Sequence, residues 1–155
     1  MAQGTFYIHF KSKRDLLEEF VRYLSRELRR TLKRATEGIQ DRREMEREGM
    51  LTFFRFLRLH RSIYRVVAEN ETVGRDAGMW YYEKLAEGYI PGLKKGVRRR
   101  EIRDLPEVFM VRSLMGFNHM IGLKWLVWKS LPLAELPKSL LNEAVQFVMD
   151  GLAPS

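Results

Sequence analysis

Side chains able to hydrogen-bond to a polyanion gather near the start of the chain. Residues 4–14, GTFYIHFKSKR, include a threonine, a tyrosine, a histidine and three basic residues. Hydroxyl, imidazole and cationic groups are donors that contact phosphate oxygens, and the amide of Gln3 can pair with a base edge. On residue types alone, Tyr7 and His9 are more typical of an ordinary surface where a loop meets a helix.

The sequence lacks the spacings of known catalytic and metal sites. It has no cysteine, which excludes disulfides, thiolate metal sites and cysteine nucleophiles. None of its three histidines, His9, His60 and His119, follows a glutamate by three residues, as a di-iron helical bundle requires. The motifs HExxH, G-x-S-x-G and the phosphate-binding glycine loop are also missing. We therefore expect no enzyme and no cofactor, and a helical enzyme is kept as an alternative.

The charge balance favours a polyanionic partner. The chain has 155 residues, enough for one domain with a real core, and 45% of them are apolar. Its formal net charge is +8, which suits nucleic acid or an anionic membrane surface.

A membrane span is not expected in the most apolar stretch, residues 108–128. Arg112, Asn118, His119 and Lys124 lie within it, and such groups are costly at bilayer depth. A buried helix is the better interpretation, and no signal peptide follows Met1. We expect a cytoplasmic protein without a membrane partner, and a membrane-associated helical protein is the second alternative.

Apolar residues recur with helical spacing along nearly the whole chain, which predicts an all-α fold. Ser12 is the expected N-cap of the first helix, with Asp15 three residues on, and Gly38 is its expected end. Asp104 is the expected cap of a later helix, and the basic run 94–103 is expected to be an exposed turn. Helices are predicted over residues 12–37, 42–59, 62–69, from 75 onward, 105–129 and 137–152.

The helix over residues 114–128 is apolar on nearly every side, which indicates burial on more than one face. In a small chain, one such face can pack inside while another meets a second subunit. Together with the last helix it would form a four-helix contact in a two-fold dimer. A central helix in a monomeric bundle is the alternative. The predicted interface residues are Met120, Leu123, Lys124, Val127, Trp128, Leu141, Ala144, Val145 and Val148.

The stretch GTFYIHFKSKRDLL, residues 4–17, resembles the end of the helix-turn-helix in TetR-family transcriptional regulators. The matching positions are Gly4, Thr5, Phe6, Tyr7, His9, Phe10, Lys13 and Leu16. The resemblance implies a remnant of the helix-turn-helix followed by a helical ligand-binding and dimerisation domain. Residues 1–37 would belong to the DNA-binding head, and residues 38–155 would bind the effector and form the dimer.

This resemblance gives the polar residues of the opening stretch their roles. The recognition helix of such a motif lies in the major groove with its first turns against base edges. Gln3 would pair with adenine, and Thr5 would contact a thymine methyl group or a phosphate. Basic residues farther along the first long helix, such as Arg30, are expected to be a solvated face. The predicted DNA-contacting residues are Ala2, Gln3, Gly4, Thr5, Tyr7, His9 and Lys13.

The family pattern also places two helices and the start of the recognition helix before this stretch. At about 11–12 residues per helix, roughly 30 or more residues would precede it. We expect the 155-residue chain to dimerise but not to bind an operator tightly.

The resemblance further implies a ligand-responsive repressor that a small hydrophobic or amphipathic effector releases from operator DNA. Aromatic and flexible side chains would line the effector pocket, and a few polar groups would orient the ligand. For any one of the aromatic residues, plain core packing is the competing interpretation. The candidate pocket residues are Phe53, Phe54, Tyr64, Met79, Trp80, Tyr82, Met110, Arg112, Phe117, Asn118 and His119.

Overall fold

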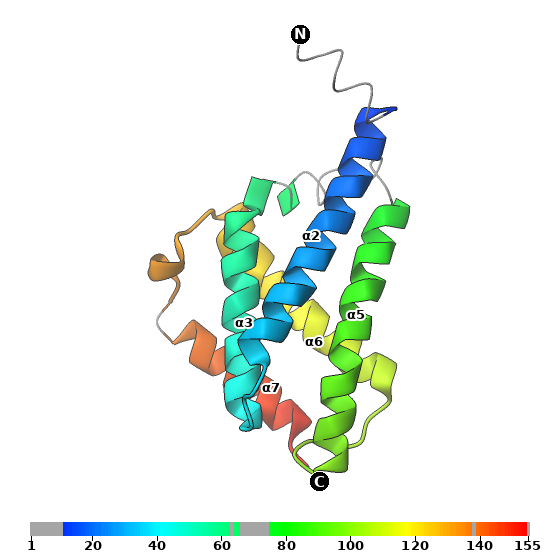
Figure 1. The fold of residues 1–155 in the computed structure, drawn as a ribbon. Helices are drawn as coiled ribbons and strands as arrows, with labels where there is room; N and C mark the ends of the chain where they lie inside the picture. The colour runs from blue at the N-terminus through cyan, green and yellow to red at the C-terminus, as the bar shows by residue number, and fades with distance from the viewer. Residues whose placement is uncertain (1–10, 63, 66–74, 138, 155) are drawn as a thin grey trace.

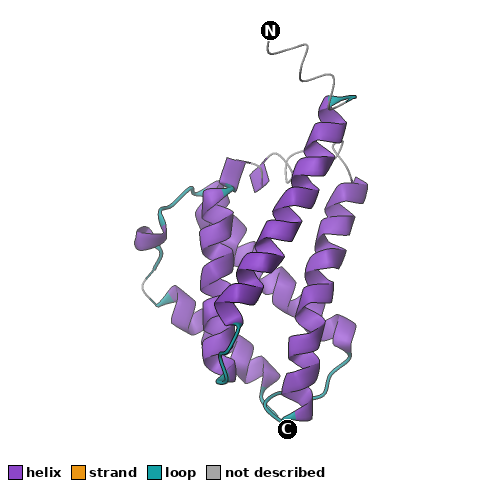
Figure 2. Ribbon diagram, in the orientation of Figure 1, coloured by secondary structure: helices purple, strands orange, loops and turns teal. Residues whose placement is uncertain are grey.

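The structure is a computed structural model that describes residues 11–62, 64–65, 75–137 and 139–154. Those residues form helices and loops without a strand (Figure 2), which confirms the predicted all-α fold. Three long helices run along the molecule, and the remaining ones cross behind them (Figure 1). The elements are α2 (Lys13–Thr36), α3 (Arg42–Leu59), α5 (Arg75–Arg98), α6 (Glu107–Gly122), the π-helix η1 (Leu123–Trp128), the 3-10 helix η2 (Leu133–Glu135) and α7 (Leu140–Leu152).

Side-chain caps and a glycine set the limits of the first two helices. The backbone N–H of Asp15 donates to Ser12 Oγ over 3.1 Å, so Ser12 caps α2 as predicted. Gly38 follows the end of α2 with φ +83°, a conformation that glycine adopts without a steric penalty. The N–H of Glu44 donates to Asp41 Oδ1 over 2.7 Å, so Asp41 caps α3.

Three predicted boundaries are wrong. The basic run 94–103 is helical as far as Arg98, and the turn begins only after that residue. Pro106 is the N-cap of α6, so Asp104 does not cap it. The last helix begins at Leu140 and not at residue 137. Tertiary packing explains the first correction, because Ile102 is buried in the turn and holds the end of α5 close.

The core is centred on α3, which packs against α2, α6, α7 and η1. Phe54 and Leu57 of α3 are almost completely buried. A Cβ atom on Gly122 would overlap Leu57 Cδ1, so glycine at this position lets α6 approach α3 closely. On the other side of α3, the apolar stripe of α2 joins the same core through Leu24 and Leu28.

The predicted helix over residues 62–69 lies partly outside the described residues. Within the predicted range, residues 62, 64 and 65 are helical. Arg65 fixes this segment to the end of η1, because its Nη2 donates to Val127 O over 3.2 Å and to Ser130 Oγ over 3.1 Å. Among the helices of the described ranges, none has the length and apolar character that a membrane crossing requires.

Candidate functional site

Several predicted pocket residues meet in an aromatic cluster inside the bundle, which we define as Phe53, Tyr64, Tyr81, Tyr82 and His119. Tyr82 Oη and His119 Nε2 are 2.9 Å apart and share a hydrogen bond. A second hydrogen bond joins the hydroxyl groups of Tyr64 and Tyr81. The imidazole of His119 also lies beside the rings of Phe53 and Tyr64. Hydrogen bonds between polar groups thus join the segment at Tyr64, α5 and α6, and Phe53 of α3 adds an apolar ring beside them.

Burial disfavours the charged forms of the titratable groups in this cluster. It raises the pKa values of Tyr64, Tyr81 and Tyr82 above that of an exposed tyrosine. It lowers the pKa of His119, because desolvation penalises the imidazolium form. Neutral hydroxyl and imidazole groups are suited to hydrogen bonding. Among the described residues, no group of three or more His, Asp or Glu side chains could hold a metal ion.

Other candidate pocket residues lie elsewhere. Phe54 and Met110 are buried in the core, whereas the side chain of Met79 is 57% exposed and faces away from it. The ring of Trp80 lies 4.7 Å from the guanidinium carbon of Arg22. Arg112 is exposed and forms an ion pair with Glu83. The ring of Phe117, which is partly buried against the core, stacks on that of Phe147.

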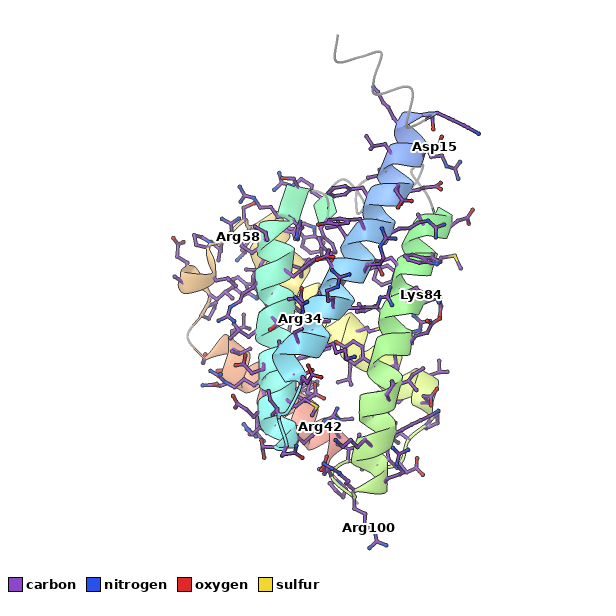
Figure 3. All side chains as sticks on the ribbon, in the orientation of Figure 1. Asp15, Arg34, Arg42, Arg58, Lys84 and Arg100 are labelled. Carbon is purple, nitrogen blue, oxygen red and sulfur yellow. The ribbon has the colours of Figure 1, made fainter. Side chains whose placement is uncertain are left out.

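A separate cleft of about 750 Å³ opens between α2, α3 and α5. Of the predicted pocket residues, only Asn118 lines this cleft. The cleft includes the C-terminal half of α2 and the start of α3. In Figure 3, Arg42 at the start of α3 and Asp15 near the start of α2 lie at opposite ends of the bundle. The cleft is therefore distant from the end of the molecule where the predicted DNA-contacting stretch enters α2.

Arg42 is a buried cation in the cleft wall. Its guanidinium pairs with Glu46 one turn along α3, and both side chains are about nine-tenths buried. Arg42 Nη1 also donates to the carbonyl oxygen of Gly92 on α5 over 3.3 Å. Close by, burial raises the pKa of the Tyr89 hydroxyl to about 12. Removing either member of the Arg42–Glu46 pair would leave a buried charge without compensation.

Of the predicted DNA-contacting residues, only Lys13 belongs to the described part of the chain. It is exposed and is the first residue of α2, directly after the Ser12 cap. Ala2, Gln3, Gly4, Thr5, Tyr7 and His9 lie outside the described residues.

The predicted dimer interface divides into exposed and buried residues. Leu123, Val127, Ala144, Val145 and Val148 lie in the core of the chain itself, so a partner cannot contact them in this arrangement. The apolar stripe of α7 is used internally, and this packing is the physical reason for the correction. Met120, Lys124 and Trp128 are exposed, and Leu141 is partly buried.

Sequence reasoning did not identify two exposed phenylalanine residues and one buried arginine. Phe109 and Phe147 are 60% and 67% exposed, and each is an apolar residue outside the buried stripe of its helix. That position off the stripe was the signal that could have identified them. The burial of Arg42 had no such signal, because it lies in a highly charged run that is typical of a solvated surface.

Comparisons with known proteins support the fold. No family model matches the chain, and neither does any curated protein. A crystal structure of a Syntrophomonas wolfei protein assigned to the TetR family of transcriptional regulators is similar, with a TM-score of 0.73 and 18% sequence identity. The match covers 96% of this chain and 74% of that protein. The chain therefore has the all-α fold of a TetR-family transcriptional regulator.

Proposed function

We propose that the chain is part of a dimeric, ligand-responsive DNA-binding transcriptional regulator that acts as a repressor. The observation that carries this proposal is the fold. The Syntrophomonas wolfei regulator described above has a similar fold over 96% of this chain. The TetR-like stretch at residues 4–17 and the net charge of +8 point to the same partner, operator DNA.

In this proposal, residues 1–37 belong to the DNA-binding head and residues 38–155 bind the effector and form the dimer. Helix α2 would connect the two functions. Its residues Val21, Leu24 and Leu28 pack in the core that α3 and α5 also form. An effector that favours one arrangement of α3 and α5 would thereby move the start of α2 and change the spacing of the two heads.

The dimer surface proposed here differs from the one predicted from sequence, because five of the predicted residues are buried inside the chain itself. We propose that the outer face of α6, η1 and α7 meets a second copy of the chain. Large apolar side chains are exposed there, and aromatic and methionine side chains are enriched in protein interfaces. The proposed surface consists of Phe109, Phe117, Met120, Lys124, Trp128, Leu141 and Phe147.

Selection of duplexes from a random pool by the full-length protein tests DNA recognition directly. We expect enrichment of a defined sequence. Gln3→Ala should relax specificity at one position of that sequence, because an amide pair with adenine discriminates by about 1–3 kcal/mol. Lys13→Ala should instead weaken binding to all duplexes alike and reduce the salt slope by about 1.

Arg30→Ala is the matched control for these variants. Arg30 is on the exposed side of α2, where its side chain is 58% exposed and pairs with Glu27. Its loss should leave both affinity and specificity unchanged. A pool from which no sequence is enriched would contradict the proposed function.

A further inference from the structure

Two neighbouring residues that follow α3, Tyr64 and Arg65, connect different parts of the bundle. Tyr64 is buried, and its hydroxyl group shares a hydrogen bond with that of Tyr81 on α5. Arg65 is exposed, and its Nη2 atom donates to Val127 O over 3.2 Å and to Ser130 Oγ over 3.1 Å. One side chain of this pair therefore contacts α5, and the other contacts the end of η1.

The end of η1 departs from α-helical geometry, which leaves a carbonyl oxygen for Arg65. In a continued α-helix the N–H of Leu131 would donate to Val127 O, four residues before it. It donates to Trp125 O over 3.1 Å instead. Ser130 has φ +54°, a left-handed conformation that residues other than glycine rarely adopt, and its Oγ donates to Val127 O over 3.1 Å. Two side-chain donors thus replace the backbone donor, and Arg65 supplies one of them from another part of the chain.

The last turn of η1 joins the core to the outer face of the molecule. Leu126 and Val127 are completely buried, whereas the next residue, Trp128, is exposed. Lys124, one turn earlier, is exposed as well. Both Lys124 and Trp128 belong to the proposed dimer surface. A π-helical turn is rare and is often found at functional sites. The geometry of this turn therefore sets how the proposed surface presents Trp128.

The Tyr64–Arg65 pair gives α5 a direct connection to this turn. Helix α5 packs on α2 and α6, whereas η1 packs on α3 and α6. The Cα atoms of consecutive residues stay about 3.8 Å apart. A displacement of Tyr64 that follows Tyr81 must therefore also displace the backbone of Arg65.

We propose that the Tyr64–Arg65 pair couples the position of α5 to the conformation at the end of η1. While Tyr81 holds Tyr64, Arg65 lies within hydrogen-bonding distance of Val127 O and fixes the last turn. When α5 moves, this hydrogen bond is lost and the turn that carries Trp128 becomes less stable. The consequence for dimer formation rests on the proposed function, whereas the coupling itself is a property of the single chain.

Hydrogen–deuterium exchange of the η1 amides tests the proposal in the chain without DNA. Arg65→Met removes both donated hydrogen bonds, so the amides of residues 123–131 should exchange about tenfold faster. Tyr81→Phe removes the partner of the Tyr64 hydroxyl group and should accelerate exchange of the same amides about threefold. In the double variant, Tyr81→Phe should add nothing to the effect of Arg65→Met, because its influence on η1 passes through Arg65.

Two variants serve as controls. Arg55→Met removes an exposed arginine from α3. Tyr89→Phe removes a hydroxyl group from α5, about two turns beyond Tyr81. Neither control should change exchange in η1. The amides of α3 are the internal reference, since unchanged exchange there shows that Arg65→Met and Tyr81→Phe have not weakened the whole fold.

Two results would overturn the proposal. One is that Arg65→Met leaves exchange in η1 as it is in the native chain. The other is that Tyr81→Phe has the same effect on η1, or none, whether or not Arg65 is present. Because the exchange experiment contains no duplex, a failed selection of DNA would refute the proposed function and leave these results unaffected.

Discussion

His119 is a partly buried imidazole whose charged form the fold disfavours. Burial lowers its pKa, and that of His60 in the same direction. In the unfolded chain a histidine titrates near pH 6.5. Below that pH the unfolded state binds more protons than the folded state, so the free energy of unfolding falls as the pH falls. Above that pH both states hold a neutral histidine, and His119 does not lower the stability.

We predict that His119→Gln makes stability less dependent on pH between about pH 7 and pH 5. The measurement is the urea midpoint across that range. Tyr82→Phe is the control, because it removes the hydroxyl partner but preserves the burial that lowers the pKa of His119. Equal slopes for the native chain and His119→Gln would show that His119 is not responsible.

Gly122 is a glycine that packing requires. Its substitution by alanine would place a methyl group against Leu57 and near Phe53 and Phe54. We predict a loss of about 1–3 kcal/mol in the free energy of unfolding, as is typical of an overpacked core. Gly92→Ala is the matched control, since a Cβ atom there would meet no described atom within 4 Å. If Gly122→Ala and Gly92→Ala have the same free energy of unfolding, the close packing of α6 on α3 is contradicted.

Local signals at single residues were readable in the sequence, whereas contacts between distant residues were not. Ser12 and Gly38 were predicted correctly because a cap and a helix stop depend on neighbouring residues alone. The burial of Arg42 depends on Gly92 of α5, fifty residues away along the chain. Trp80 was assigned to the pocket by type, but its direction toward Arg22 is set by how α5 packs on α2.

At the scale of elements, the start of α3 depends on its cap. Asp41→Ala removes the acceptor of the Glu44 N–H. We predict a loss of about 1 kcal/mol in the free energy of unfolding, the usual effect of losing an N-cap. Asp41→Asn retains an oxygen acceptor, so its free energy of unfolding should fall by only about a few tenths of a kcal/mol. Chemical denaturation of the two variants checks the prediction, which fails if alanine and asparagine behave alike.

Helix positions followed from periodicity, but their ends depended on tertiary packing. Residues 42–59 were predicted as a helix with the bounds that α3 has. The π-helix η1 was not predicted, because its apolar residues have the same composition as an α-helix. The cleft was not predicted either. It forms where three helices meet, and the residues that line it are distributed over all three.

At the scale of the whole molecule, the exposed apolar face of α6, η1 and α7 is the surface on which we propose that two copies of the chain meet. We predict that Phe147→Glu weakens dimerisation by about 2–4 kcal/mol, the loss expected at an interface hot spot. Sedimentation equilibrium should then report a monomer at concentrations where the native chain is a dimer. Tyr23→Glu is the control, because Tyr23 is an exposed aromatic residue on α2. A native chain that sediments as a monomer would contradict the proposed surface.

The central claim is that two copies of this fold act together on one DNA site. The most direct measurement is the mass of the complex between the protein, as its gene encodes it, and a duplex that it has selected. We predict two protein chains on each duplex, since a two-fold dimer places two heads on one site. A complex with one chain per duplex, or no complex at the concentrations used for selection, would contradict the claim.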